Sequence, residues 1–216
     1  MENKIKTIIV DDEPLARKGL AIRLAEFDDI ELVEQCSNGE DAMAFVENEE
    51  PDLIILDLNM QGMDGLDILK AMRNKGVTSR IVMLTVSDND EDVVEAIRSG
   101  ADGYLLKDMD PEDIVEKVRQ ATLGKMVISE KLTDILATAL RRPNKASENP
   151  LSSLTSREQE ILKYVAKGLS NKLIARELNI SDGTVKVHVK HLLKKLGLRS
   201  RVEAAVWMVN LKTGAA

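Results

Sequence analysis

Charged and hydroxyl side chains directly follow four short apolar runs of this sequence. The residues in these positions are Asp11, Asp12, Asp57, Thr85 and Lys107. Open parallel sheets bind ligands beyond the carboxyl ends of their strands, because the strand ends meet there at one edge. Three carboxylates, a hydroxyl and an ammonium would therefore converge on one site if these runs are parallel strands.

Three carboxylates held together in a low dielectric repel one another and stay ionised only if a cation joins them. Mg²⁺ is the economical cation, because it takes a few carboxylate oxygens, keeps several waters and accepts phosphate oxygens. We expect Asp12 and Asp57 to bind Mg²⁺ directly and Asp11 to bind it through water. A carboxylate beside Mg²⁺ and Lys107 is also suited to accept a phosphoryl group, with Asp57 as the nucleophile.

Two further residues have expected roles around such a phosphoryl group. Thr85 would donate its hydroxyl to a phosphoryl oxygen, and Tyr104 could turn inward behind it. Each side chain taken singly also has an ordinary role, since an Asp after a strand is usually a turn or helix N-cap and a lone Lys is usually solvated. The coincidence at four strand ends favours a site.

The elements that must position these residues are short β-branched runs alternating with amphipathic stretches. The predicted strands are Ile5–Val10, Glu31–Cys36, Leu53–Leu56, Ile81–Leu84 and Tyr104–Leu106. The predicted helices are Pro14–Phe27, Glu40–Asn48, Gly65–Asn74, Asp90–Ser99 and Pro111–Leu123. This alternation predicts a doubly wound α/β domain over residues 1–125, with a five-stranded parallel sheet in the flavodoxin-like order 2-1-3-4-5.

The remainder of the chain reads as a linker and a small all-α domain. Residues 126–153 comprise a weaker helical segment, Ser129–Leu140, and a polar stretch, Arg141–Ser153. Residues 154–216 are predicted to form four short helices that begin near Thr155, Ser170, Ser181 and Ser200. Capping boxes are expected where Glu158 and Glu203 follow Thr155 and Ser200 by three residues.

The charges divide between the two predicted domains. Residues 150–216 hold 12 Lys and Arg against 5 Asp and Glu, whereas residues 1–149 hold 18 against 32. Such an asymmetry favours a nucleic-acid-binding module joined to a part with another role. The single cysteine, Cys36, excludes a disulfide framework, and the absence of an export signal or a long apolar run leads us to expect a cytoplasmic protein.

The segment Ser181–Leu196 combines an apolar stripe with a basic face. Lys186, Lys190 and Lys194 lie one above the next, where like charges repel unless an anion neutralises them. With a preceding short helix and turn, residues 171–196 predict a helix-turn-helix whose second helix enters the major groove of duplex DNA. The residues expected at base edges are Lys186, Val187 and Lys190, and those expected at phosphates are Asn171, Lys172, Lys194, Lys195 and Arg199. The pair His188 and His191 lacks companion metal ligands, so His191 is assigned to the DNA-facing surface.

Four segments of the acidic part resemble the receiver domain of two-component response regulators. They are VDDEP (Val10–Pro14), LIILDLNM (Leu53–Met60), LTVSD (Leu84–Asp88) and GADGYLLKD (Gly100–Asp108). The resemblance implies phosphorylation of Asp57 by a sensor histidine kinase, the main-chain carbonyl of Asn59 as a further Mg²⁺ ligand, and switching roles for Thr85, Tyr104 and Lys107. The chain departs from the family at Gln61, where proline is common, which puts the lifetime of the phosphoryl group in doubt.

The basic part, Leu154–Leu196, resembles the output domain of the NarL/FixJ (LuxR-type) regulators, and several segments look most like the nitrate/nitrite branch. The resemblance implies that the unphosphorylated receiver covers the DNA-reading helix. Phosphorylation would free it, so that two output domains pair on inverted DNA half-sites as a homodimer. The implied dimer contact is the last helix, Arg201–Asn210, through Val202, Val206 and Val209.

Three alternatives remain open on the sequence. A regulator of the same family could answer a different signal. A Mg²⁺-dependent aspartyl phosphohydrolase also needs an Asp after a strand, although Asn59 stands where an acid for the leaving group would be needed. A DNA-binding protein whose α/β half is only a scaffold is the third.

Overall fold

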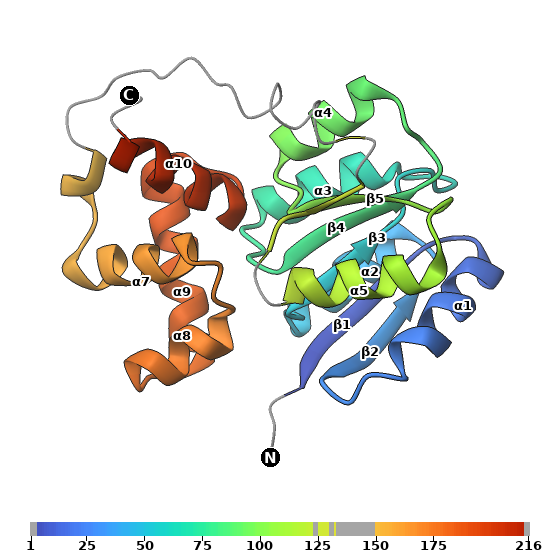
Figure 1. Ribbon diagram of the computed structural model, residues 1–216, viewed down its shortest axis with the longest axis horizontal. Helices are drawn as coiled ribbons and strands as arrows, with labels where there is room; N and C mark the ends of the chain where they lie inside the picture. The colour runs from blue at the N-terminus through green and yellow to red at the C-terminus, as the bar shows by residue number, and fades with distance from the viewer. Residues whose placement is uncertain (1–3, 123–124, 130–131, 133–149, 214–216) are drawn as a thin grey trace.

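A parallel sheet with helices on both faces forms the N-terminal part of the chain (Figure 1). The computed structural model describes residues 4–122, 125–129, 132 and 150–213. The strands are β1 (Ile5–Val10), β2 (Ile30–Cys36), β3 (Leu53–Leu56), β4 (Arg80–Thr85), β5 (Gly103–Leu106) and β6 (Val127–Ile128). The helices are α1 (Pro14–Leu24), α2 (Gly39–Asn48), α3 (Gly65–Asn74), α4 (Asp90–Ser99) and α5 (Pro111–Thr122).

The strands pair in the order β2-β1-β3-β4-β5-β6, all parallel. The predicted doubly wound fold and the order of the first five strands are confirmed. The expectation of five strands is wrong by one, because β6 pairs with β5 through Gly103–Val127 and Tyr104–Ile128. A strand of two residues offers no periodicity, so the sequence pattern could not reveal it.

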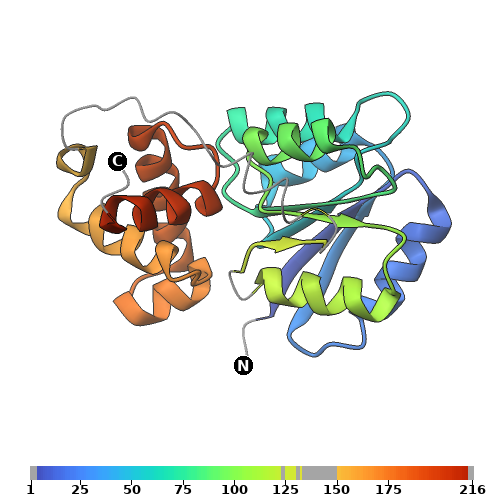
Figure 2. The ribbon, with the colours of Figure 1, turned by 45° about the horizontal axis from the view of Figure 1, so that its top comes forward.

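Two hydrophobic layers fix this sheet between its helices (Figure 2). Alternate residues of a strand point to opposite faces, so Ile8 joins the layer under α2, α3 and α4, and Ile9 joins the layer under α1 and α5. The central strands β3 and β4 are buried along their whole length. Burial on both faces is typical of parallel sheets, and it holds the strand ends in fixed relative positions.

The basic part of the chain is helical. It comprises the 3₁₀ turn η2 (Pro150–Ser153), α7 (Ser156–Ala166), α8 (Asn171–Leu178), α9 (Asp182–Leu196) and α10 (Arg201–Thr213), packed around one core. The capping box of Thr155 and Glu158 is confirmed. At the start of α10, Ser200 Oγ accepts the Glu203 N–H, while the Glu203 carboxylate accepts the Arg199 N–H.

Most of the predicted linker helix Ser129–Leu140, and residues 141–149 after it, lie outside the described residues. Within the described part of the chain, every helix falls short of the length and hydrophobicity that a membrane span needs.

Candidate functional site

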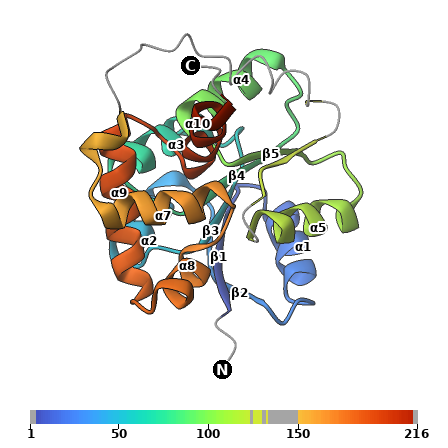
Figure 3. The same ribbon diagram turned by 60° about the vertical axis from the view of Figure 1, so that its left-hand side comes forward.

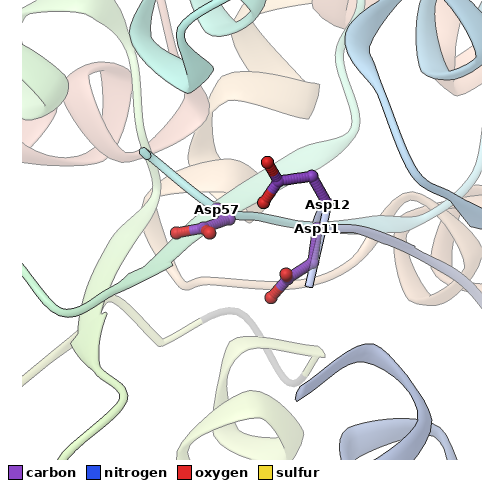
Figure 4. Close-up of side chains that lie close together, drawn as sticks. All are labelled: Asp11, Asp12 and Asp57. Carbon is purple, nitrogen blue, oxygen red and sulfur yellow. The ribbon is translucent and has the colours of Figure 1, made fainter. Parts of the chain in front are cut away.

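The three aspartates predicted from the strand ends lie together (Figure 4). Asp11 and Asp12 follow β1, Asp57 follows β3, and one carboxylate oxygen from each lies within 4.8 Å of the others. Asp11 and Asp57 are each 4% exposed, whereas Asp12 is half-buried. The carboxylates therefore form an acidic pocket at the carboxyl edge of the sheet, as the parallel strand order requires.

The Lys107 ammonium bridges two of these carboxylates from the end of β5. Its Nζ lies 2.9 Å from Asp11 Oδ2 and 2.8 Å from Asp57 Oδ2. Burial raises the pKa of Asp57, against the opposing effect of the Lys107 ammonium. Burial lowers the pKa of Lys107, but hydrogen bonds to Asp57 and Asp11 outweigh that effect and raise it overall.

The donor set of the acidic pocket fits a hard divalent cation. Three carboxylates face one bridging ammonium, so negative charge remains in excess where two of the carboxylates are buried. Clustered carboxylates of this kind suit Mg²⁺, which uses few protein oxygens and leaves positions for water or phosphate. The pocket thus meets the chemical requirements predicted from the sequence.

The loop after Asp57 closes over the acidic pocket and contacts it through backbone groups. The Gln61 N–H donates to Asp12 Oδ2 at 2.8 Å, and the Asn59 N–H donates to Asp57 Oδ1 at 3.4 Å. At the position where the family commonly has proline, this chain therefore uses an N–H that proline lacks. That hydrogen bond is a physical reason for Gln61 to be compatible with an ordered loop.

Thr85 and Tyr104 are both fully buried beside this loop. Thr85 Oγ1 accepts hydrogen bonds of 3.1 Å from the Asn59 side-chain amide and from the Ser87 N–H. The Tyr104 hydroxyl donates to the Ser87 carbonyl at 3.0 Å, and burial raises its pKa. The expected inward position of Tyr104 is thus already adopted in this structure, and both side chains are linked to the β4–α4 loop.

Gly65 provides the close approach that fixes the Asp57 loop. A Cβ added to Gly65 would lie 1.9 Å from the backbone oxygen of Asp57. Because the clashing atom belongs to the backbone, a side-chain rotation cannot relieve this clash, and the backbone itself must move. We expect Gly65→Ala to lower the free energy of unfolding by about 2–3 kcal/mol. Urea unfolding followed by circular dichroism measures this change.

Gly19 offers the matched control, because it lies within α1 and a Cβ there would contact nothing within 4 Å. Gly19→Ala is expected to raise the free energy of unfolding by about 0.5–1 kcal/mol, since alanine loses less backbone entropy in a helix. Equal unfolding midpoints for the two variants would show that the Gly65 contact does not constrain the loop.

The predicted helix-turn-helix is formed by α8 and α9. Ser181 caps α9, Asn179 ends α8 in the left-handed region with φ 51°, and Val185, Val189 and Leu192 are fully buried. The apolar stripe of α9 therefore faces the core as predicted, which leaves its lysines on the outer surface.

The outer surface of the helical domain packs against the amino-terminal edge of the sheet, opposite the acidic pocket (Figures 1 and 3). Lys186 Nζ donates to the Glu50 carbonyl at 2.9 Å, and Lys190 Nζ donates to the Lys75 carbonyl at 3.2 Å. Two of the nine residues expected to contact DNA are thus bound to receiver carbonyls.

Two further predicted phosphate contacts also touch the receiver. Lys172 forms an ion pair of 2.8 Å with Asp52, and Arg199 donates to the Arg98 carbonyl at 3.2 Å. We call these two contacts, together with those of Lys186 and Lys190 and the hydrogen bond of 3.2 Å from Arg80 Nη2 to the Gly168 carbonyl, the domain interface. In this arrangement the receiver contacts four of the nine residues that the sequence predicts to contact DNA.

The other residues expected to contact DNA divide into two groups. Val187 is 52% exposed, and Lys194 and His191 are also exposed. Lys195 instead forms an ion pair of 2.7 Å with the buried Glu158, and Asn171 is buried with its side-chain oxygen accepting from Arg201. In this conformation those two side chains serve the helical domain itself, because each completes a local polar contact.

The predicted dimer face on α10 is only partly at the surface. Val202 is 7% exposed and Val206 is partly buried, whereas the Val209 side chain lies outside what the structure describes. Val202 would therefore have to become accessible before it could join two chains.

The receiver side of the domain interface was not predicted. Glu50, Lys75 and Arg98 contribute main-chain carbonyls, which every residue type carries and which therefore leave no signal in the sequence. Asp52 and Arg80 contribute side chains, but a charged residue before a strand has many ordinary roles.

Comparisons with known proteins agree with both halves of this geometry. Residues 7–119 match the response regulator receiver domain, and residues 152–208 match the bacterial regulatory proteins of the luxR family. The chain is 51% identical to the nitrate/nitrite response regulator protein NarL of Escherichia coli (strain K12) over 93% of each chain, and 48% identical to NarP of the same strain, also over 93% of each. The crystal structure of the response regulator ChrA, from a heme-sensing two-component system, matches with a TM-score of 0.51 and 32% identity over 97% of this chain and 98% of that one.

The family is one of DNA-binding regulators, not of enzymes, so the phosphohydrolase alternative is removed. With a receiver fold that carries the acidic pocket and a luxR-family domain that carries the basic helix, this chain belongs to the two-component response regulators of the NarL type.

Proposed function

We propose that this chain is a transcription regulator of the cytoplasm whose DNA binding is switched on when a sensor histidine kinase phosphorylates Asp57. The observation that carries the proposal is the domain interface, in which Lys186 and Lys190 donate to receiver carbonyls. Side chains bonded there are withheld from DNA, so a signal at the acidic pocket can act by releasing them.

The phosphoryl transfer is assigned to the residues of the acidic pocket. Mg²⁺ would be held by Asp11, Asp12 and Asp57 with the main-chain carbonyl of Asn59, and when bound it would neutralise charge on the phosphoryl group. An Asp57 carboxylate oxygen attacks phosphorus, an O–P bond forms, and the bond from phosphorus to the donor histidine breaks. Lys107, already 2.8 Å from that carboxylate, stabilises the negative charge.

The response to phosphorylation is assigned to Thr85 and Tyr104. In the present structure, Thr85 Oγ1 accepts hydrogen bonds from the Asn59 amide and the Ser87 N–H. When the Thr85 hydroxyl donates to a phosphoryl oxygen, Oγ1 moves away from these two donors. Ser87 also holds the Tyr104 hydroxyl, so the β4–α4 loop is the element that would move with the phosphoryl group.

The released α9 is assigned to the major groove of duplex DNA. Lys186, Val187 and Lys190 would reach base edges, with phosphates contacted by a wider set comprising Asn171, Lys172, His191, Lys194, Lys195 and Arg199. Two chains would pair through Val202, Val206 and Val209 of α10 on inverted half-sites. Lys195 and Asn171 must exchange their present partners to take part.

The signal is proposed to be nitrate or nitrite, because two relatives with 51% and 48% sequence identity to this chain are named nitrate/nitrite response regulator proteins. An Escherichia coli strain without NarL and NarP, supplied with this chain and a reporter that depends on NarL, tests the proposal. Nitrate-dependent expression is expected from the wild type and not from Asp57→Ala. A silent reporter, while acetyl phosphate still labels Asp57, would instead assign the chain to a different signal.

A further inference from the structure

Two buried guanidinium groups meet at the domain interface, near the Asp102 carboxylate, whose charge acts favourably on both. Arg80, the first residue of β4, is 3% exposed, and Arg201, the first residue of α10, is 6% exposed. Within the described residues, neither forms an ion pair. The nearby Asp102 carboxylate is engaged by Arg73 at 2.8 Å and by the Ile81 N–H at 3.0 Å.

The hydrogen bonds of the two arginines place their guanidinium groups side by side. Arg80 Nη2 donates to the Gly168 carbonyl at 3.2 Å, and Arg201 Nη2 donates to the carbonyl of the next residue, Leu169. Consecutive residues lie only about 3.8 Å apart along the chain. Two positive charges are thus held on neighbouring carbonyls of the α7–α8 loop.

Arg80 is the less well satisfied of the two. Among residues 4–122, 125–129, 132 and 150–213, its buried Nη1 has no hydrogen-bond partner, and neither has the buried Oδ1 of Asp102. Arg201 has a second acceptor in Asn171 Oδ1 at 3.2 Å, within its own domain. Burial, with Arg201 next to it, lowers the pKa of Arg80 to about 9.

Burial of Arg80 and the charge of Arg201 beside it both act towards separation of the domains, whereas Asp102 attracts both arginines. A buried ion costs more in lost hydration than one hydrogen bond returns, and a like charge beside it adds repulsion. Because the one side-chain hydrogen bond that Arg80 forms with the described residues is to the helical domain, its guanidinium regains water when that domain leaves. The ion pair and lysine contacts of the domain interface act in the opposite direction.

We propose that Arg80 and Arg201 form a repulsive pair that keeps the closed arrangement, in which the domain interface is formed, only marginally stable. Phosphorylation then needs to supply little free energy to separate the domains. This regulation rests on the proposed function, in which the closed arrangement prevents DNA binding. Arg80 lies five residues before Thr85 on the same strand, about 16 Å away, so the pair and the acidic pocket lie at opposite ends of β4.

Three substitutions of Arg80 separate its charge from its hydrogen bond. Arg80→Lys keeps the charge, Arg80→Gln keeps an N–H donor without the charge, and Arg80→Met removes both. Apparent DNA affinity of the full chain without a phosphoryl donor reports the open fraction, because only the open form binds. If the charge opposes closure, Arg80→Met and Arg80→Gln should each weaken this affinity about tenfold, while Arg80→Lys should resemble the wild type.

The opposite pattern would overturn the proposal. Tighter DNA binding by Arg80→Met, with Arg80→Gln like the wild type, would show that the bond to Gly168 latches the domains. Unchanged affinity in both uncharged variants would show that the pair contributes nothing. Thermal unfolding of each variant establishes that it is folded.

A second measurement is independent of DNA and of phosphorylation. Spin labels at the exposed positions Lys18 and Lys163, with the buried Cys36 replaced by alanine, report the separation of the domains directly. Arg80→Met and Arg80→Gln should narrow the distance distribution towards the closed form. If beryllofluoride leaves wild-type DNA binding unchanged, the proposed switch fails, while these distances still decide the role of Arg80.

Discussion

Replacing Asp57 by alanine is expected to abolish transfer of phosphoryl from acetyl phosphate to this protein. Asp57 is the carboxylate that Lys107 holds at 2.8 Å, at the end of a fully buried strand. Alanine removes the nucleophilic oxygen, and the neighbouring Asp11 is fixed by Lys107 and by the Glu13 N–H at 2.8 Å. Mass spectrometry after incubation with Mg²⁺ and acetyl phosphate measures the incorporation.

The matched control is Asp88→Ala, which removes an exposed carboxylate from the β4–α4 loop. This variant should incorporate phosphoryl to the same extent as the wild type. Omission of Mg²⁺ should prevent labelling of the wild type, because the clustered carboxylates would then repel the incoming phosphoryl group. Labelling that persists in Asp57→Ala would place the acceptor elsewhere.

The double substitution Lys186→Ala with Lys190→Ala is expected to weaken DNA binding by about 10²-fold in the presence of beryllofluoride and Mg²⁺. Each lysine contributes a base-edge contact and a positive charge in the groove, and a good base contact is worth about 1–3 kcal/mol. The dependence of log affinity on log salt should become shallower by about 2, since two fewer counterions are released. Fluorescence anisotropy over a salt series measures both quantities.

The same double substitution removes two hydrogen bonds of the domain interface. The residual affinity should therefore depend less on beryllofluoride than it does in the wild type. Lys163→Ala provides the control, because Lys163 is exposed on α7 and outside the domain interface. Wild-type affinity and salt slope in the double variant would contradict the assignment of α9 to DNA.

The acidic pocket could be predicted from the sequence because parallel strands bring their carboxyl ends to one edge. Asp11 and Asp57 follow strands that pair directly, in the register Val10–Leu56, so one residue beyond each strand is enough to bring them together. The apolar stripe of α9 was predictable for a similar reason, since helical periodicity alone determines which residues face the core. In both places local pattern and tertiary position agree.

The domain interface could not be predicted, because it depends on how two separately folded parts meet. The sequence predicts that Lys186 faces DNA, but the same ammonium group can also donate a hydrogen bond to the Glu50 carbonyl, as it does in this structure. Whether Arg80 is hydrated or buried against Gly168 also depends on docking, not on β4 itself. The hydrogen bond that Asn171 accepts from Arg201 could not be predicted either, because it depends on how α10 packs against α8.

The affinity of the full chain for inverted-repeat promoter DNA, at one salt concentration, tests the central claim most directly. Wild type and Asp57→Ala are compared with and without beryllofluoride and Mg²⁺. A gain in affinity confined to the wild type with beryllofluoride is the predicted result, because it couples the acidic pocket to the helix on the opposite edge of the sheet. Equal affinity in all four samples would contradict the account and leave a DNA-binding protein that its receiver does not control.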